Sequence, residues 1–281
     1  MNYFDIPIND KEQTIIYKRI KGFELKLMFF PATKKTEEFS PIYFIIPGGG
    51  WVNAKPESMV DFSHQSVTEL RKKGYSVVSV EYRVYSMSDS VVMDDCISDC
   101  FDAVRYICHF SDILKIDKNR IVFSGHSAGG HLALMLAYAP DDLYKSEIGL
   151  EEHWETLCVC PMSAITVLSK VNGEYAFSVD SPIIEKNYDD EVREKWSPVF
   201  YITKDSPPTL LCVGTNDPYV ANISYIMAME KLKENNVPAT LLVSEGGGHC
   251  FEEVKDGIIP SKDMKYMQSK IVDFILANTN C

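Results

Sequence analysis

The sequence has few positive charges for its size. Its 281 residues include 28 lysines and arginines against 40 aspartates and glutamates, which gives a formal net charge of −12 at pH 7. A field of this sign repels a phosphate backbone, so we expect no nucleic-acid partner. The same repulsion disfavours long polyanionic substrates, whereas it does not distinguish among neutral ones.

Long apolar runs are also missing. No stretch approaches the roughly 18 apolar residues that a membrane-spanning helix needs, so we expect no membrane partner. The segment 1–10 does not join a basic stretch to an apolar one, as a secretory signal peptide does. We therefore expect a protein without a secretory leader.

The eight cysteines show neither the spacing of a metal site nor that of a disulfide framework. Cys158 and Cys160 alternate inside an apolar run, as buried strand residues do, and Cys96, Cys100 and Cys108 have helical spacing. Small buried thiols of this kind are typical of the reducing cytoplasm, which is the location we expect. We expect no metal and no cofactor.

The remaining composition is that of a globular protein, with 46% hydrophobic and 24% charged residues. Alternating apolar and polar side chains in 14–17 and 23–29 predict two antiparallel strands. Short runs rich in Val, Ile and Leu follow, as expected of strands buried on both faces. These runs are 42–47, 75–82, 120–125, 156–162, 209–214 and 239–244.

Helical patterns separate these runs. The clearest ones cover 97–108, the stretch after Ser127, 221–234 and 262–276. Alternation of strands and helices predicts an α/β fold, with a mostly parallel sheet of about eight strands and helices on both faces. Because no repeat or linker interrupts the chain, we predict a single domain over 1–281. Reactive residues of such sheets lie at the carboxyl ends of the strands.

The segment 163–208 interrupts the alternation. It separates two predicted core strands and contains Pro182, Trp196, Pro198, Pro207 and Pro208. A long irregular connection in a compact domain often forms a lid or a pocket wall, which is our prediction here. A passive surface excursion is the alternative.

The strongest local signal is Gly125-His126-Ser127-Ala128-Gly129, which matches the pattern G-x-S-x-G. A buried strand precedes it and an apolar helix follows, which is the context of a nucleophilic serine on a sharp strand-to-helix turn. We expect Gly125 and Gly129 to be glycine because side chains there would collide with the flanking strand and helix. Ser127 is therefore the candidate nucleophile, and a chance match or a structural turn is the alternative.

Three consecutive glycines follow the strand 42–46, in Pro47-Gly48-Gly49-Gly50-Trp51. Acyl transfer needs backbone N–H groups aimed at the oxyanion of the tetrahedral intermediate. We expect Ala128 and either Gly49 or Gly50 to donate them. A phosphate-binding loop is disfavoured because neither the P-loop nor the dinucleotide spacing is present. Trp51 is a candidate substrate-binding residue, and packing over the loop is the alternative for it.

A serine nucleophile needs a base. His249 directly follows the last apolar run, in a glycine-rich loop, and is our candidate. The other histidines fit structural positions better. His64 lies in a helical pattern, His109 ends a helix, His126 points elsewhere on the turn, His131 packs one turn into a helix, and His153 lies in an acidic stretch.

The base needs an acid to orient its ring. Asp217 follows the run 209–214 at the same sheet edge and completes the chain order Ser, Asp, His. Asp205, Glu245 and Glu252 are rivals, and Asp205 precedes its strand and so lies at the wrong edge. An Asx turn before Pro218 is the alternative role for Asp217.

With these residues the chain resembles the esterase and lipase group of the α/β-hydrolase fold. It is most similar to bacterial acetyl esterases of the feruloyl and acetyl-xylan esterase type and to kynurenine formamidase-like relatives. Pro47 stands where that group usually has histidine, the residue that generally orients the oxyanion loop. The matching stretches, which span most of the chain, are 47–51, 81–83, 116–130, 197–198, 207–218 and 246–251.

The resemblance implies a serine carboxylesterase that acts on short acyl esters, acetyl above all, with a sugar or a small alcohol as the leaving group. Two alternatives stay open. One is an amidase that cleaves aryl formamides, and the other is a non-catalytic ligand-binding homologue such as the plant gibberellin receptor, which usually lacks a triad residue. A small-molecule ester is the expected partner, and both a monomer and a homodimer fit the sequence.

Overall fold

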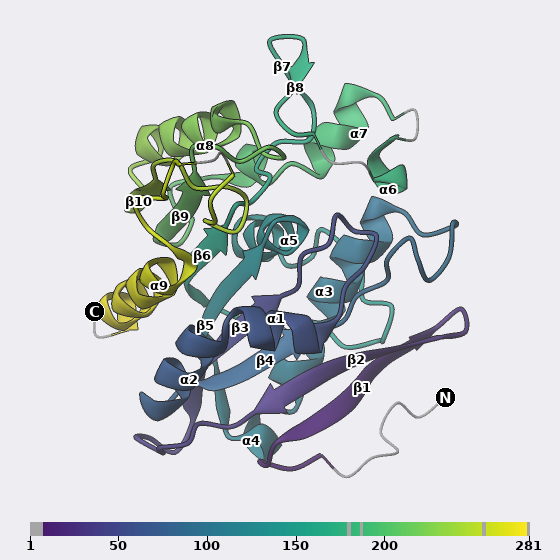
Figure 1. The fold of residues 1–281 in the computed structure, drawn as a ribbon. Coiled ribbons are helices and arrows are strands. Elements are labelled where there is room, and N and C mark those ends of the chain that lie inside the picture. The colour runs from purple at the N-terminus through teal and green to yellow at the C-terminus, as the bar shows by residue number, and fades with distance from the viewer. Residues whose placement is uncertain (1–7, 179–180, 186–187, 255–256, 280–281) are drawn as a thin grey trace.

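A computed structural model describes residues 8–178, 181–185, 188–254 and 257–279. Eight strands form one sheet in the order β1-β2-β4-β3-β5-β6-β9-β10 (Figure 1). β1 and β2 pair antiparallel, β2 pairs antiparallel with β4, and all pairs from β4 to β10 are parallel. The predicted mostly parallel sheet is therefore confirmed. The strands are β1 (Gln13–Ile20), β2 (Phe23–Phe30), β3 (Ser40–Ile46), β4 (Ser76–Val80), β5 (Ile116–His126), β6 (Thr156–Met162), β9 (Thr209–Gly214) and β10 (Ala239–Ser244).

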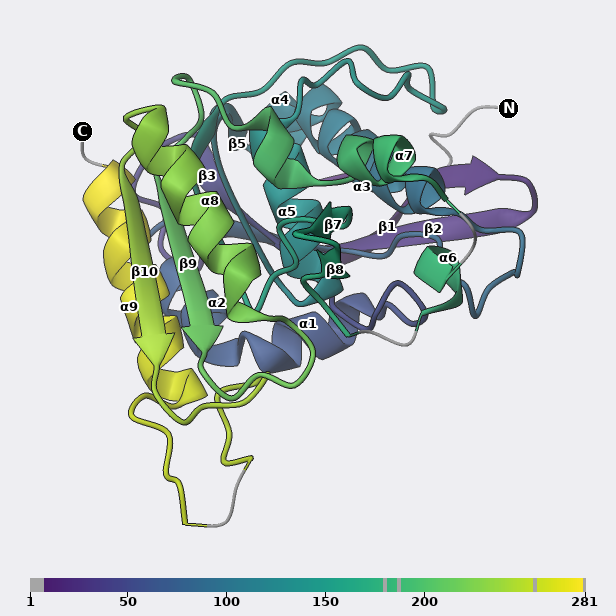
Figure 2. The ribbon, with the colours of Figure 1, turned by 90° about the horizontal axis from the view of Figure 1, so that it is seen from above.

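Helices cover both faces of this sheet. One face packs against α1 (Pro56–Phe62), α2 (His64–Lys72) and α9 (Met264–Thr279). The other packs against α3 (Met93–His109), α5 (Ala128–Tyr138) and α8 (Asn222–Glu234), and the short α4 (Ser111–Leu114) leads into β5. Figure 2 shows α8 and α9 on opposite sides of β9 and β10. Within the described residues, no helix combines the length and the apolar character needed to cross a bilayer.

Strand β3 shows why the sheet is buried on both sides. Ile42, Phe44 and Ile46 point into the core beneath α3 and α5, and Tyr43 and Ile45 point into the core beneath α2 and α9. A strand with two buried faces must be apolar throughout, which explains its continuous rather than alternating hydrophobic pattern.

The segment 163–208 contains several short elements. These are β7 (Lys170–Val171), β8 (Glu174–Tyr175), α6 (Pro182–Glu185), α7 (Asp190–Lys195) and the 3-10 helix η1 (Pro198–Tyr201). Figure 1 shows β7, β8, α6 and α7 at one end of the molecule. The backbone of Phe177 pairs with Val220, and the N–H of Ser178 donates to the carbonyl of Tyr219 at 2.7 Å. The segment is thus fastened to the loop that follows β9.

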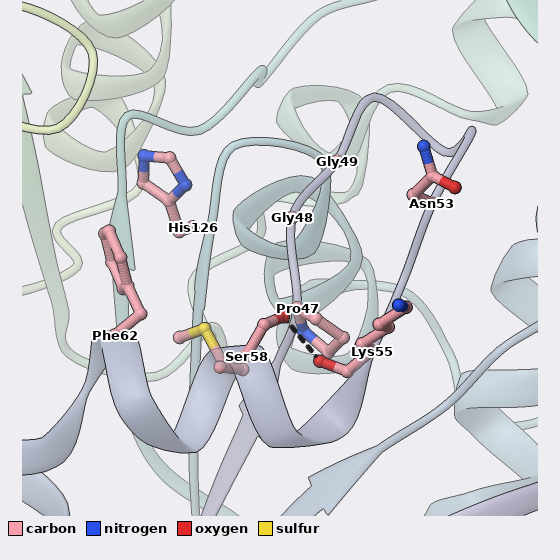
Figure 3. Close-up of a pocket in the computed structure, with 9 residues that line it drawn as sticks. Pro47, Gly48, Gly49, Asn53, Lys55, Ser58, Phe62 and His126 are labelled. Atoms are coloured by element: carbon pink, nitrogen blue, oxygen red, sulfur yellow. Dashed lines mark hydrogen bonds between the residues drawn. The ribbon is translucent and has the colours of Figure 1, made fainter.

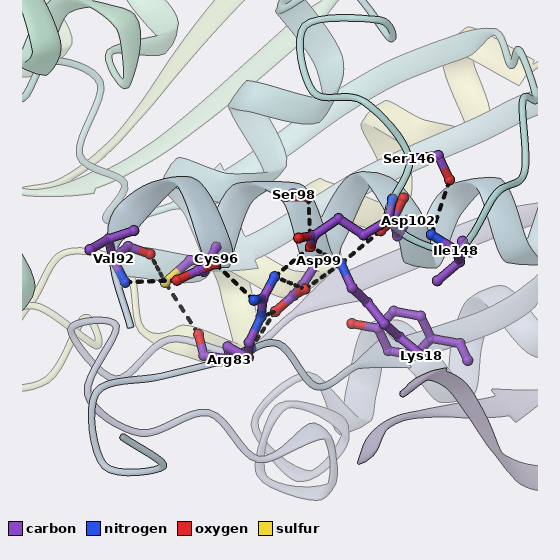
Figure 4. A network of polar contacts seen from close by, with 12 residues as sticks. Lys18, Arg83, Val92, Cys96, Ser98, Asp99, Asp102, Ser146 and Ile148 are labelled. Carbon is purple, nitrogen blue, oxygen red and sulfur yellow. Dashed lines mark hydrogen bonds and ion pairs between the residues drawn. The ribbon is translucent and has the colours of Figure 1, made fainter. Parts of the chain in front are cut away.

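A cluster of buried charges joins β1, α3 and the loops around them (Figure 4). Lys18 lies 2.7 Å from both Asp99 and Asp102, and Arg83 makes two 2.8 Å hydrogen bonds to the carboxylate of Asp99. Glu147 accepts from both cations, at 2.6 Å from Lys18 and 2.7 Å from Arg83. Buried charges are tolerated only when they are paired in this way. We call Lys18, Arg83, Asp99, Asp102 and Glu147 the buried charge network.

Candidate active site

Ser127 lies between the end of β5 and the start of α5, in a strained turn. Its backbone has φ 55° and ψ −121°, and its N–H donates to the carbonyl of Met162 at 2.9 Å. A non-glycine residue in such a conformation costs about 1–3 kcal/mol, which the surrounding structure must offset. The turn projects the serine away from both elements, toward a cavity at the carboxyl end of the parallel strands.

Close backbone contacts explain the glycines on either side of this turn. A Cβ atom at Gly125 would overlap the carbonyl oxygen of Gly129, and one at Gly129 would overlap the carbonyl oxygen of Ile46. The collisions expected from the sequence are therefore present. Because both residues are glycine, α5 can begin directly against β3 and β5.

His249 and Asp217 form a hydrogen-bonded pair. His249 Nδ1 lies 2.8 Å from Asp217 Oδ2, and the carboxylate side chain is only 1% exposed. Asp217 Oδ1 accepts the backbone N–H groups of Tyr219 at 2.8 Å and Val220 at 3.1 Å. Asp217 therefore forms the Asx-type turn contacts with one carboxylate oxygen, as in the alternative role considered from the sequence. With the other oxygen it orients His249.

The loop that carries His249 is fixed through its backbone carbonyl. Ser163 Oγ donates to that carbonyl at 2.6 Å, and His126 Nε2 lies 3.0 Å from it. The rings of His126 and Tyr219 flank the His249 ring, with centroids 4.7 Å and 4.9 Å away. These contacts leave little freedom for the histidine to move away from Asp217.

His126 and Tyr219 are therefore neighbours of the candidate base that the sequence did not identify. Burial, with the nearby His249 as a smaller cause, lowers the pKa of His126 to about 4, so this ring is neutral at pH 7 and can donate from Nε2. The prediction that His126 points elsewhere on the turn was wrong. For Tyr219 a signal was available, since it lies in the same turn as Asp217.

The glycine loop approaches Ser127 from β3. Gly49 and Gly50 adopt positive φ values of 117° and 61°. Ala128 is the first residue of α5, so its N–H has no acceptor within the helix. These are the three residues expected to bind an oxyanion.

Several hydrogen bonds hold this loop without the histidine that Pro47 replaces. Tyr82 Oη donates to the carbonyl of Pro47 at 2.9 Å, and the N–H of Tyr85 donates to the carbonyl of Trp51 at 3.0 Å. Ser181, from the segment 163–208, donates its hydroxyl to the carbonyl of Gly50 at 2.6 Å. The loop is thus anchored from two directions.

Trp51 does not line the pocket. Its side chain is fully buried and packs edge-on against His131, with ring centroids 5.3 Å apart. The structure therefore corrects the expectation that Trp51 contacts substrate and shows the packing role instead. The neighbouring Val52 lines the cavity in its place.

Four of the predicted residues, Gly49, Gly50, Ser127 and His249, line one cavity of about 440 Å³. It is lined by Gly49, Gly50, Val52, His126, Ser127, Tyr219 and His249, with Asp217 behind His249. Within the described part of the chain, no three His, Cys, Asp or Glu side chains gather as a metal site would require. The cavity therefore combines a hydroxyl, an imidazole–carboxylate pair and a glycine loop.

The other histidines lie elsewhere. His131 is buried, with Nε2 2.7 Å from the carbonyl of Trp196, and burial lowers its pKa to about 4. His109, at the end of α3, lies 3.1 Å from Glu152, and His153 is exposed beside Asp141. His64 is the first residue of α2 and is exposed.

Comparison with known proteins places these residues in a family context. Residues 28–232 match the BD-FAE family. The chain is 25% identical to an AB hydrolase superfamily protein of Schizosaccharomyces pombe, over 79% of this chain and 66% of that protein. It is 22% identical to an esterase of Fusarium pseudograminearum, over 76% of this chain and 67% of that protein.

The chain covers only part of the length of several relatives. It spans 12% of methylphloroacetophenone synthase from Cladonia uncialis, with 22% identity over 85% of this chain. It also spans about two thirds of the Schizosaccharomyces and Fusarium proteins.

Solved structures share the whole fold. A thermophilic esterase from the Planctomycetes species Thermogutta terrifontis superposes with a TM-score of 0.77 and 24% identity, covering 95% of this chain and 92% of that one. Its butyrate-bound form gives a TM-score of 0.75 with 23% identity, over 95% and 94% of the two chains. From the sheet order and this superposition, the chain has the α/β-hydrolase fold, and from the match over residues 28–232 it belongs to the BD-FAE family.

Proposed function

We propose that the chain is a serine carboxylesterase. The observation that carries the proposal is the 2.8 Å pair between His249 and Asp217, at a cavity that also contains the strained Ser127. Esterases among the similar sequences and structures support this choice. Ser127 is the proposed nucleophile, His249 the general base, and Asp217 the acid that orients it.

The proposed reaction has two halves. Ser127 Oγ attacks the ester carbonyl while His249 accepts its proton, and the oxyanion rests on the N–H groups of Ala128 and of Gly49 or Gly50. His249 then protonates the departing alcohol. Water, activated by the same histidine, hydrolyses the acyl-enzyme and restores the serine.

We further propose that the acyl group is short, with acetyl preferred. The cavity of about 440 Å³ at Ser127 must hold groups on both sides of the scissile bond, which favours a short acyl group over a long one. The Thermogutta esterase has been solved with propionate and with butyrate bound, and both are short acids. Sugars and small alcohols are the proposed leaving groups, in a cytoplasmic protein.

The test is hydrolysis of p-nitrophenyl esters from acetate to decanoate by the wild type and by Ser127→Ala. We expect turnover to peak at acetate and to fall about a millionfold in the variant. Undiminished turnover in Ser127→Ala would overturn the nucleophile assignment. A wild type that cleaves aryl formamides but none of these esters would instead identify an amidase.

A further inference from the structure

A second cavity adjoins the one that contains Ser127. Its volume is about 330 Å³, and it shares Gly49 and His126 with the first cavity. Figure 3 shows the Pro47–Gly49 stretch running between Phe62 and His126 on one side and Asn53 and Lys55 on the other. The helix α1 supplies its floor.

The wall between this cavity and the nucleophile is one backbone thick. A Cβ atom built on Gly48 would lie 3.3 Å from Ser127 Cβ and 3.3 Å from His126 Nδ1. Gly48 therefore packs directly on the nucleophile turn. The two cavities meet at Gly49 and His126, so a substrate bound at Ser127 that extends past these residues enters the second cavity.

All residues that line this cavity belong to the described part of the chain. Among them, Lys55 has the only charged side chain. It is exposed and pairs with no carboxylate in the described part of the chain. His126 adds no charge at pH 7, because burial lowers its pKa to about 4. The cavity thus presents one unpaired cation in a chain whose net charge is −12.

The other lining groups are apolar below and polar at the rim. Met59 is only 2% exposed, and the ring of Phe62 lies 4.6 Å from that of His126. The hydroxyl of Ser58 already donates to the carbonyl of Lys55 at 2.7 Å, whereas Lys55 and Asn53 are exposed residues of the lining. A flat apolar group that ends in an anion matches this surface.

We propose that this cavity binds a carboxylate at the far end of the substrate, paired with Lys55, so that esters with a remote carboxylate are preferred over neutral ones. The preference for such esters rests on the proposed esterase function, whereas binding of the carboxylate does not. The carboxylate belongs either to the acyl group or to the alcohol, and the experiments below separate the two.

Binding is tested first, without turnover. Benzoate and its neutral isostere benzamide are titrated calorimetrically into Ser127→Ala and into Ser127→Ala/Lys55→Met. We expect benzoate to bind about fivefold more tightly than benzamide, and this preference to vanish without Lys55, since a solvated ion pair contributes up to about this much. Equal binding of the two probes, or a preference that survives Lys55→Met, overturns the proposal.

Lys204→Met is the matched control. Lys204 is 80% exposed, pairs with Asp205 and lines neither cavity, so its replacement removes the same charge elsewhere. We expect it to leave the preference for benzoate intact. If it lowers the preference as much as Lys55→Met does, the effect is that of net charge and the proposal fails.

Two kinetic comparisons then locate the carboxylate. Hydrolysis of 4-acetoxybenzoate against 4-acetoxybenzamide tests the alcohol side, and phenyl hemisuccinate against phenyl succinamate tests the acyl side. In one comparison the anionic-to-neutral ratio of kcat/KM should fall about fivefold in Lys55→Met and further in Lys55→Glu, with a weaker effect at high salt.

Ratios that are unchanged in both comparisons overturn the substrate preference. A wild type that hydrolyses none of these esters overturns the esterase function, and the titration with benzoate still decides the carboxylate site.

Discussion

The buried charge network and the active site are both polar clusters inside the protein, but they differ in whether their polar atoms find all their partners within the protein. In the network, Asp99 accepts from both Arg83 and Lys18, and Lys18 contacts three carboxylates. At the active site, Asp217 is equally saturated, but Ser127 and the glycine loop face an open cavity. One cluster completes its contacts within the protein, and the other leaves the last contacts to a ligand.

The difference predicts which property each cluster controls. Paired charges with no access to a ligand contribute to folding, and their loss leaves an uncompensated charge in the interior. A strained serine beside a cavity contributes little to folding and is retained for chemistry. Variants in the two clusters should therefore separate stability from activity.

Among the variants that compare the two clusters, the largest effect is expected from Asp217→Asn. The amide keeps the size of the side chain but stabilises neither the required tautomer of His249 nor its protonated form, so kcat should fall about 10⁴-fold. The free energy of unfolding should change far less, because the turn contacts to Tyr219 and Val220 go to Oδ1 and can be kept. Steady-state kinetics and urea unfolding measure the two. A loss of stability that accounts for the lost activity would contradict this division.

The next effect is expected from Arg83→Met in the buried charge network. Removing this guanidinium leaves Asp99 partly uncompensated, which should lower the free energy of unfolding by about 3–5 kcal/mol. Arg83→Lys keeps the charge and loses the two-point contact, so its loss should be smaller. Urea titrations at pH 7 measure both.

An exposed pair is the control for this prediction. Lys204 and Asp205 lie 2.8 Å apart with side chains 80% and 77% exposed. Replacing Lys204 with Met should leave the unfolding midpoint unchanged, since exposed pairs contribute little. If Arg83→Met also leaves it unchanged, the buried charge network is not a stabilising element.

The sequence predicted the residues that the sheet itself positions. Ser127, Asp217 and His249 each follow a strand, and parallel strands bring such residues to one edge whatever the loops do. The runs 156–162, 209–214 and 239–244 coincide with β6, β9 and β10, because each is a short apolar stretch bounded by polar residues or proline. The sheet topology thus places most of the candidate site residues at one edge.

The features that the sequence did not predict depend on contacts between segments that are distant in the chain. His126 reaches the carbonyl of His249 across 123 residues of sequence, and Trp51 turns inward to pack on His131. The second cavity depends on α1, a seven-residue helix too short to produce a periodic pattern. No spacing rule relates such segments, so only the folded structure shows them.

The smallest effect is expected at the contact between the segment 163–208 and the glycine loop. Ser181 is buried, and its hydroxyl donates to the carbonyl of Gly50, which fixes one peptide plane of the loop whose N–H groups are the proposed oxyanion donors. Ser181→Ala removes a single hydrogen bond of about 1 kcal/mol, so kcat should fall about five- to tenfold.

A transition-state contact is disturbed in this variant rather than substrate binding, so KM should change less than kcat. Ser178→Ala, an exposed serine of the same segment that uses its backbone to hold the loop after β9, is the matched control and should keep both constants. If Ser181→Ala raises KM alone, the segment acts as a wall of the pocket and not as a support for the oxyanion loop. Equal kinetics in wild type and Ser181→Ala would mean that the bonds from Tyr82 and Tyr85 suffice to hold the loop.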